Sequence, residues 1–338
     1  MEKVNIKSVA SVAGVSIASV SRVLNKKENV NPAIKAKVEE ALKTTGYRRN
    51  LQASGLRAKH SYTLTLLYSD PSPSYVVDLQ KGALAECDKQ GYSLNIFPCN
   101  HRNDDFLERI TDLVKHFKND GVVVAPPISD MAEVINLFEE NDIPYTRISP
   151  YIIESERPSV FCNDYGAAFD MTTYLLSLGH ERIGFIKGTD GHSASKNRFQ
   201  GYKDALFTQR IEFDESLVEQ GGFSFDTGEV CARRLLKSDN KPSVIFASND
   251  EMAAAVYKVA AQLKLDIPNN LSVVGFDDTP MTKFLWPALT TIRQPIATQA
   301  KQAVNMLLNY INDKSNEDLQ ISFDCELVLR ESTSIYRP

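Results

Sequence analysis

The sequence predicts a small all-α head of the helix–turn–helix type joined to a larger α/β body. Three observations support this prediction. The first 60 residues have the opposite net charge from the remainder of the chain. The same residues contain two short amphipathic segments separated by a turn that contains glycine. From residue 62 onward, short apolar runs alternate with helical segments, as in parallel α/β folds.

The charge asymmetry indicates that the head meets a polyanion. Residues 1–60 contain 12 Lys and Arg against 4 Asp and Glu, a net charge of +8, whereas the remainder of the chain carries −13. Lys and Arg release condensed counterions from nucleic acid phosphates, so a basic head on an acidic body suits DNA binding through the head alone. A solvated charged surface explains the charge equally well, and charge by itself leaves both interpretations open.

The composition excludes several protein classes. The 338-residue chain is 43% hydrophobic and 24% charged, as in an ordinary globular protein. No apolar run reaches the ~18 residues of a membrane-spanning helix, and the N-terminus lacks an apolar export segment, so we expect a cytoplasmic location and no membrane partner. The cysteines are never spaced as CxxC and the histidines form no metal-binding spacing, so we expect no metal and no cofactor.

The head is predicted to contain three helices. Apolar residues at helical spacing over residues 6–15 indicate a first helix that ends at Gly14, and Ser16 follows as the N-cap of a second. A third helix is predicted from Pro32 until Gly46, because proline is favoured in the first helical turn and glycine after the last. Helix, tight turn and helix in this order are typical of a DNA-binding unit, although many other small helical bundles show the same pattern.

The second helix, over residues 16–25, has an apolar side and a side suited to a DNA groove. Val20, Val23 and Leu24 fall on the side that packs inward. Small side chains can contact thymine methyl groups in the major groove, and a long arginine can pair with guanine. The side left exposed is formed by Ile17, Ala18, Ser21 and Arg22.

The body is predicted to contain doubly wound parallel sheets. Near-continuous apolar runs of strand length, separated by amphipathic helices, are typical of such sheets. The units are too many for one sheet, so we predict two similar lobes that meet near Phe161 and again near Leu289. The predicted strands are 62–69, 93–98, 122–125, 182–186, 244–247 and 271–276, and the predicted helices are 77–90, 105–118, 167–177 and 252–263.

Six motifs along the chain occur in a characteristic order. The head contains VASVAGVSIASVSRVLN, which is followed by GYRRN, ASGLR, NDEMAAAV, SVVGFDDTP and LTTIRQP. Together they resemble the LacI/GalR family of bacterial transcription regulators over essentially the whole chain. The resemblance implies a body of the periplasmic-binding-protein-like type, with two doubly wound parallel-sheet lobes around a ligand cleft. We expect a head at 1–49, a hinge at 50–60 and a body at 61–338, with one lobe at about 61–161 and 290–322 and the other at about 162–289 and 323–338.

The resemblance also implies which residues contact DNA. The family commonly has a proline where Arg49 stands, and the cation here would contact phosphate. Ala53 and Leu56 lie three apart in the hinge and would share one face of a short helix over the minor groove, with Leu56 wedged between bases; a featureless linker is the alternative. The residues assigned to DNA contact are Lys7, Ser16, Ile17, Ala18, Ser19, Ser21, Arg22, Asn25, Asn31, Tyr47, Arg49, Asn50, Ala53 and Leu56.

Residues at predicted strand ends are assigned to the ligand cleft. Arg198 and Asp277 match family positions that bind sugar hydroxyls or a carboxylate. Phe161 and Phe223 match aromatic positions that stack on a sugar ring, with core packing as the alternative. Arg147 replaces an often acidic residue, which favours an acidic or unusual ligand if it faces the cleft. The residues assigned to effector binding are Asp70, Tyr75, Arg147, Phe161, Arg198, Phe223, Asn249, Asp277 and Gln294.

Asp70 and Asn249 carry a structural interpretation as well, and their neighbours in the motifs are expected to be structural. Asp70, which precedes a proline, fits a plain turn as well as it fits the cleft. Asn249 is assigned to the ligand because Asp250, beside it, is expected to cap the following helix. Asp278 is expected to brace the turn that presents Asp277.

The function predicted from these observations is sequence-specific regulation of transcription. We expect a repressor whose affinity for a palindromic double-stranded DNA operator is controlled by a small ligand, a sugar or a derivative, and a homodimer that supplies two heads. A transcriptional activator or dual regulator is the first alternative. A sugar-binding transport protein is the second, although the basic head and the missing export segment oppose it. No enzyme is expected, because GxGxxG, GxxxxGK[ST] and GxSxG are absent.

Overall fold

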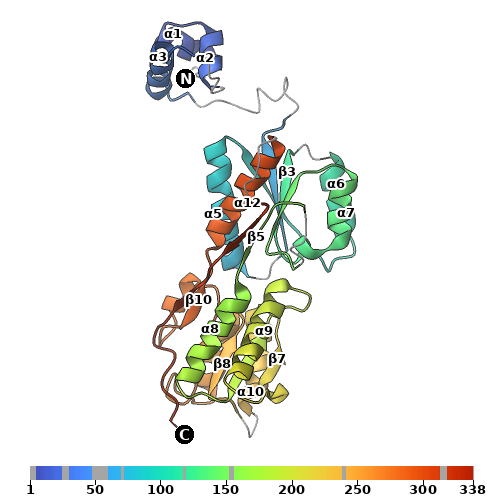
Figure 1. Cartoon of the computed structure of the whole chain (residues 1–338), viewed down its shortest axis with the longest axis vertical. Coiled ribbons are helices and arrows are strands. Elements are labelled where there is room, and N and C mark those ends of the chain that lie inside the picture. The colour runs from blue at the N-terminus through green and yellow to red at the C-terminus, as the bar shows by residue number, and fades with distance from the viewer. Residues whose placement is uncertain are drawn as a thin grey trace. The chain divides into compact units, whose positions relative to one another are not determined.

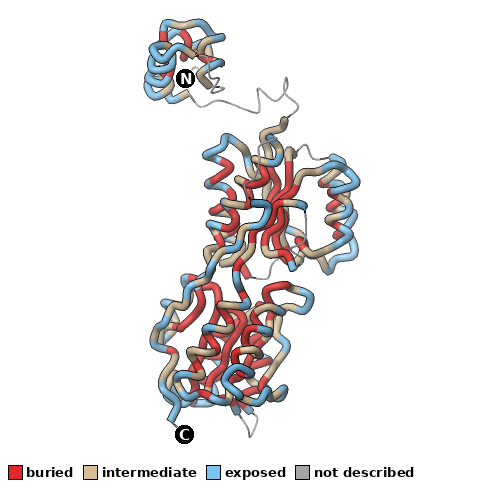
Figure 2. Tube along the Cα trace, viewed as in Figure 1, coloured by how far each residue is buried: buried red, intermediate tan, exposed pale blue. Residues whose placement is uncertain are grey.

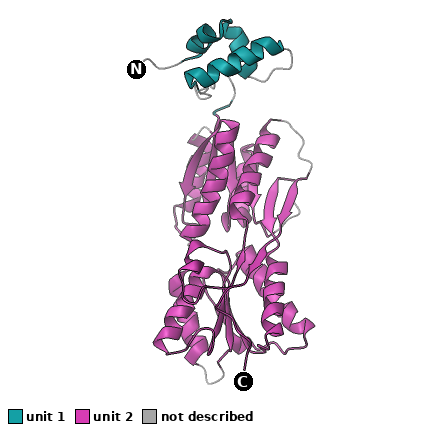
Figure 3. Cartoon of the chain, turned by 90° about the vertical axis from the view of Figure 1, so that its left-hand side faces the viewer, with its two compact units in different colours: residues 1–61 teal, residues 62–338 magenta. Residues whose placement is uncertain are grey.

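The computed structural model divides the chain into two compact units, Met1–Ser61 and Tyr62–Pro338 (Figures 1 and 3). It describes residues 5–24, 30–47, 60–69, 72–116, 119–151, 156–237, 241–312 and 318–337. Asn25, Arg49, Asn50, Ala53, Leu56 and Asp70 therefore lie outside the described residues, as does most of the predicted hinge. The two units are considered separately below.

The head consists of three helices around a small apolar core. α1 (Ile6–Ala13) and α3 (Pro32–Thr45) each end at a glycine, Gly14 and Gly46, with φ of 63° at both. The left-handed backbone at these two positions is the reason for glycine. α2 (Ile17–Leu24) lies between them, and Val9, Val20 and Val38 are completely buried. The predicted bounds of the third helix and both glycine caps are confirmed.

The first lobe is a six-stranded parallel sheet covered by helices on both faces. Its strand order is β11-β5-β4-β3-β1-β2, and every neighbouring pair is parallel. α5 and α12 pack on one face and α6 and α7 on the other (Figure 1). The strands are β1 (Thr63–Tyr68), β2 (Ser93–Pro98), β3 (Gly121–Val124), β4 (Tyr145–Ile148), β5 (Ser159–Cys162) and β11 (Gln320–Phe323). The helices are α5 (Pro73–Gln90), α6 (Phe106–His116), α7 (Ala132–Glu140) and α12 (Ile296–Ile311).

The second lobe is a four-stranded parallel sheet in the order β7-β6-β8-β9. α10 and α11 cover one face and α8 and α9 the other. The strands are β6 (Ile183–Lys187), β7 (Val218–Gln220), β8 (Val244–Ala247) and β9 (Ser272–Val274). The helices are α8 (Asp164–Ser177), α9 (Ser193–Thr208), α10 (Phe225–Lys237) and α11 (Asp250–Gln262). In both lobes the central strands form the buried layer (Figure 2).

The chain passes three times between the lobes. It crosses from β5 to α8, from β10 (Thr291–Arg293) to α12, and from β11 to β12 (Glu326–Val328). β10 and β12 pair with each other in antiparallel register, which ties two of the crossings together. Ligands bind beside the carboxyl ends of parallel strands, so a ligand site is expected at the strand ends that face the other lobe.

The predicted fold class is confirmed, including the parallel doubly wound lobes. All six predicted strands and all four predicted helices of the body occur within a few residues of their expected positions. The predicted strand 271–276 is shorter in the structure, because Gly275 ends β9 before the loop that carries Asp277. Among the described residues no single helix is long and apolar enough to cross a membrane; α1 and α2 reach that length and composition only jointly and are bent by 105°.

Candidate DNA-reading face and ligand cleft

α2 presents the predicted DNA-reading face on the surface of the head. The Ser16 hydroxyl accepts a hydrogen bond from the Ser19 backbone N–H at 3.1 Å and so caps the helix. Ile17, Ala18 and Arg22 are exposed, whereas Val20 on the opposite side is buried. The exposed strip therefore consists of small side chains and one long cation, the combination that can enter a major groove.

The remaining described residues assigned to DNA contact take mixed positions. Lys7 is exposed on α1, while Ser19 and Ser21 are half-buried on α2. The Asn31 side chain accepts a hydrogen bond from the Ala33 N–H and caps α3. Tyr47 packs against the core of the head. Asn31 and Tyr47 thus have structural roles that account for them without DNA.

A small pocket between the two lobes collects most residues predicted to bind the effector. This inner pocket has a volume of about 30 Å³. Two hydrogen bonds link the lobes beside it, from Ser72 Oγ to Glu251 Oε1 and from Ser193 Oγ to the Ser149 carbonyl. They hold the lobes close, which accounts for the small volume. The lining residues are Ser72, Tyr75, Pro126, Ser149, Asp164, His192, Ala194, Arg198, Phe223, Asn249, Asp277 and Gln294.

Arg198 forms the centre of the inner pocket. It lies in the second turn of α9. Its Nε donates to Asp164 Oδ1 at 2.8 Å, and its guanidinium lies 3.8 Å from Asp277 Oδ1. The guanidinium also stacks 3.5 Å from the centre of the Phe276 ring. With only 4% of its surface exposed, Arg198 is a buried cation held by two carboxylates and an aromatic ring.

Asp277 is presented to the pocket by a strained backbone. Its φ is 115°, and two further lining residues, Ser149 and Phe223, also have positive φ. Each such conformation costs on the order of 1–3 kcal/mol and is found mainly at functional sites. The carboxylate accepts a hydrogen bond from Gln294 Nε2 at 2.7 Å. Burial raises the pKa of Asp277 to about 7, even though Arg198 and Gln294 oppose the shift.

Asp277 should make stability depend on pH. Its pKa is raised from 3.8 unfolded to about 7 folded, so the stability that protonation gives is complete below pH 4 and is lost as the pH rises to about 7. Urea unfolding should show that the free energy of unfolding of the wild type falls relative to that of Asp277→Asn as the pH rises through this window. The fall should be at most about 1.4 kcal/mol per pH unit. Burial lowers the pKa of His192 to about 3, but this contribution cancels between the two proteins. A constant difference from pH 4 to 7 would contradict the prediction.

Asn249, and not Asp250, caps the helix that follows β8. Asn249 is the N-cap of α11, because its side chain accepts from the Met252 N–H at 2.9 Å, and it also donates to the Phe223 carbonyl. It nevertheless lines the inner pocket. The cap prediction for Asp250 is wrong. Its completely buried carboxylate accepts from the Thr279 N–H at 2.7 Å and from the Thr291 hydroxyl at 2.6 Å.

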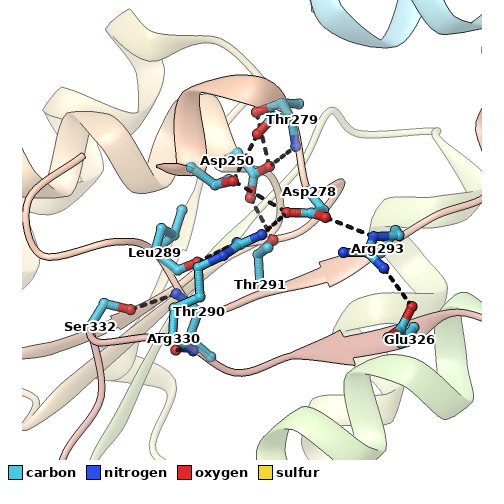
Figure 4. Close-up of polar contacts among 11 residues, drawn as sticks. Asp250, Asp278, Thr279, Leu289, Thr290, Thr291, Arg293, Glu326, Arg330 and Ser332 are labelled. Atoms are coloured by element: carbon cyan, nitrogen blue, oxygen red, sulfur yellow. Dashed lines mark hydrogen bonds and ion pairs between the residues drawn. The ribbon is translucent and has the colours of Figure 1, made fainter. Parts of the chain in front are cut away.

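A polar network behind Asp277 joins its loop to the crossing strands (Figure 4). Asp278 accepts from Arg293 Nε at 2.7 Å and from Arg330, and Arg293 also donates to Glu326 across the β10–β12 pair. Although burial opposes it, these two arginines hold the pKa of Asp278 below its ordinary value. Asp278 therefore braces the turn as expected. The network fixes the loop that aims Asp277 and anchors it on strands that connect the lobes.

Arg147 and Phe161 do not line the inner pocket. Arg147 is buried on β4, where its guanidinium pairs with Asp130 at 3.1 Å and donates to the Ser129 carbonyl. Phe161 lies half-buried on β5. The sequence analysis assigned both residues to the effector site, but side-chain direction depends on tertiary contacts that one sequence does not reveal.

Three lining residues with clear chemistry were missed by the sequence analysis. Asp164 follows β5, His192 follows β6 and precedes α9, and Ser72 precedes α5. Each lies at or directly before the start of a helix that follows a strand, so the strand-end rule that selected Asp277 could have selected them too. Phe223, which was predicted, depends on Gly188, because a Cβ there would lie 2.0 Å from its ring.

Two family models match the chain. One, described as bacterial regulatory proteins of the lacI family, matches residues 5–50, and the other, described as a periplasmic binding protein-like domain, matches residues 172–333. The first match lies over the helical head. The match to the periplasmic binding protein-like domain covers most of the second lobe. It also covers α12 and β11 of the first lobe and the crossings that lead to and from them.

Similarity to known proteins extends over the full length. The transcriptional repressor CytR of Escherichia coli (strain K12) is 30% identical, over 97% of this chain and 96% of its own. The transcriptional regulator DegA of Bacillus subtilis (strain 168) is 31% identical, over 98% of each chain. The solved structure of a complex of the transcriptional regulator CelR with cellobiose has a TM-score of 0.76 at 26% identity, over 98% of this chain and all of that one. The chain therefore belongs to the LacI family of bacterial regulatory proteins.

Proposed function

We propose that this protein is a transcriptional repressor that binds an operator through α2 and responds to a small ligand in the inner pocket between the lobes. One observation carries the proposal: a separate helical head exposes Ile17, Ala18 and Arg22, and the same chain folds a two-lobed body whose inner pocket is lined by Arg198 and Asp277. The first feature can read DNA and the second can bind a polar ligand.

The effector fits best as a neutral sugar. In the inner pocket the charge of Arg198 is balanced by Asp164. Arg147 would favour an acidic ligand only if it lined the pocket. It lies outside the pocket, where Asp130 pairs with its charge. Asp277, Gln294 and Asn249 offer the donors and acceptors that hydroxyl groups need. The related CelR is bound to cellobiose, which supports the same ligand class.

Ligand control would act through the arrangement of the lobes. Gln294 lies on the segment that crosses from β10 to α12, and it donates to Asp277 of the second lobe. A hydroxyl that competes for Asp277 would change this contact and favour a different lobe arrangement. Such a ligand shifts operator affinity by as much as its affinity differs between the two arrangements.

We propose a cytoplasmic homodimer without cofactor or catalytic activity. Two heads on a two-fold axis double the base contacts and match a palindromic operator. Phe284 and Trp286 leave 83% and 89% of their surface exposed beside the second lobe, and a second copy is the partner we assign to them. Activation in place of repression would follow from operator position at the promoter, so it remains the alternative.

Arg22→Ala tests the DNA-reading role. Loss of a bidentate base contact should weaken binding to a selected palindromic operator by about 1–3 kcal/mol and leave binding to random DNA nearly unchanged. Fluorescence anisotropy at several salt concentrations measures both affinities. Lys7→Ala is the matched control, because a phosphate contact weakens both DNAs alike and lowers the salt dependence. An equal loss on both DNAs for Arg22→Ala would remove its base-reading role.

A further inference from the structure

Two of the five cysteines lie where the chain crosses between the lobes. Cys162 is the last residue of β5, and the first crossing, from β5 to α8, begins directly after it. Cys325 lies in the third crossing, between the end of β11 and the start of β12. Both are free thiols. The side chain of Cys162 forms a hydrogen bond with that of Cys325, so the two sulfurs are neighbours.

The pairing of β5 with β11 explains why these thiols meet. The two strands are parallel neighbours with Phe323 opposite Cys162, and the Asn163 N–H donates to the Phe323 carbonyl at 3.0 Å. Residues two apart along a strand direction point to the same face of a sheet, so Cys325 follows Phe323 on the side that carries Cys162. Backbone hydrogen bonds therefore hold together the two segments that carry the thiols.

Cys162 also contacts a residue that follows the second crossing. Gln299 lies in the first turn of α12, which the chain reaches from β10, and its Nε2 donates to Cys162 Sγ at 2.9 Å. Side chains from all three crossings thus meet at one buried sulfur. The pairing of β10 with β12 already joins the second and third crossings. A covalent bond between Cys162 and Cys325 would join the first crossing to them.

Cys325 is the thiol that an oxidant reaches first. It is half-buried, whereas Cys162 exposes only 4% of its surface. The hydrogen bond with Cys325 and burial raise the pKa of Cys162, so Cys162 keeps its proton, and the thiolate is the form that attacks an oxidant. Although burial opposes the shift, Asp164, Asp277 and also Cys325 raise the pKa of Arg198. A thiolate formed at Cys325 therefore faces the Arg198 cation.

We propose that Cys162 and Cys325 are a redox-sensitive thiol pair whose disulfide joins the first crossing to the third and restricts movement of one lobe against the other. In the cytoplasm, which is the location we propose, disulfides are usually transient and serve catalysis or redox sensing. The disulfide does not depend on the proposed function, whereas its consequence for operator binding rests on it.

The oxidant is a peroxide, and the reaction takes two steps. The Cys325 thiolate attacks one oxygen of hydrogen peroxide, the S–O bond forms, the O–O bond breaks, and the departing hydroxide takes up the thiol proton to give water. The Cys162 sulfur then attacks the sulfur of the Cys325 sulfenic acid. The S–S bond forms, the S–O bond breaks, and the hydroxyl group leaves with the Cys162 proton as a second water. Each sulfur loses one electron, and the peroxide gains both.

Peroxide treatment of the reduced full chain tests the pair. Two of the five thiols should be lost, and mass mapping of peptides prepared without reductant should find a cross-link between Cys162 and Cys325 that dithiothreitol reverses. Cys325→Ser should form no cross-link and keep Cys162 as a thiol.

Cys99→Ser is the matched control for this experiment. Cys99 is half-buried like Cys325, but its thiol donates to the Tyr68 carbonyl within the first lobe. Cys99→Ser should therefore form the cross-link as the wild type does. A wild-type Cys162 that remains a thiol after the treatment, or a cross-link formed only between different chains, would overturn the pairing.

Amide hydrogen exchange tests the effect on the lobes. In the oxidised wild type, the paired amides of β10 and β12 should exchange at least about tenfold more slowly than in the reduced protein, because their opening then requires movement of three linked crossings. The amides of β3, inside the first-lobe sheet, are the internal control and should not change. Peroxide-treated Cys325→Ser should show no slowing at either place.

Two outcomes separate this inference from the proposed function. If the disulfide forms and the amides of β10 and β12 exchange as before, the restriction of the lobes is wrong. If the disulfide forms and slows this exchange but the protein binds no operator in either redox state, the proposed function fails and the thiol pair stands.

Discussion

Replacing Arg198 with methionine is expected to lower the free energy of unfolding by about 3–5 kcal/mol and to abolish the response to effector. Methionine keeps much of the side-chain volume but leaves Asp164 and Asp277 buried without their cation. The stacking on Phe276 is weakened as well. Urea unfolding at pH 7 measures the first effect, and ligand titration at a temperature where the variant is folded measures the second.

A matched surface variant distinguishes this loss from a general effect of removing arginine. Arg233 pairs with Glu229 on the surface of α10, where solvent screens the interaction. Arg233→Met should therefore change stability little and leave effector binding intact. If Arg198→Met were as stable as Arg233→Met, the buried ion pairs would contribute nothing to stability. If it still bound effector normally, Arg198 would be removed from the site.

Asp250→Ala should be the second most disruptive change, with an expected loss of about 3 kcal/mol or more. The substitution leaves the Thr279 N–H, the Thr279 hydroxyl and the Thr291 hydroxyl without their acceptor in a fully buried position. Burial and the neighbouring Asp277 raise the pKa of Asp250 above its ordinary value, but its oxygens remain the acceptors. Since Thr279 follows the loop of Asp277 directly, we expect weaker effector binding together with lower thermal stability.

The isosteric variant separates the hydrogen bonds from the cavity that alanine leaves. Asp250→Asn keeps the volume and one carbonyl acceptor, so its loss of stability should be clearly smaller than that of Asp250→Ala. Thermal unfolding of both variants, with and without a saturating saccharide, gives the comparison. Equal losses in the two variants would mean that the cavity plays no part and that both carboxylate oxygens are essential.

Most of the fold could be predicted because local signals agreed with the tertiary structure. In the head, Gly14, Ser16 and Gly46 mark helix ends through backbone requirements that depend on few neighbours. In the body, buried parallel strands have continuous apolar sequences, so β3 and β8 were easily recognised. The family and the regulatory function are confirmed by relatives of full length.

The candidate site was less predictable because it depends on side-chain direction. Asp277 and Gln294 could be assigned from strand ends and motifs, and they meet in the structure. Arg147 could not be assigned correctly, because its partner Asp130 lies in the short 3-10 helix Ile128–Asp130, which is distant from Arg147 in the sequence. Nor does any local signal tell that Asp250 accepts from Thr291 while Asn249 caps the helix, since both side chains suit both positions.

The three crossings between the lobes also determine when the body can fold during synthesis. The first lobe needs α12 and β11, which are made only after the whole second-lobe sheet has been translated. Until then the apolar faces of α5 and β1 lack the helix that covers them. A chain stopped before residue 296 would expose these faces, and a body cut at β5 would yield two incomplete pieces. The head has no such dependence, because its core lies within one continuous stretch near the N-terminus and can form first on the ribosome.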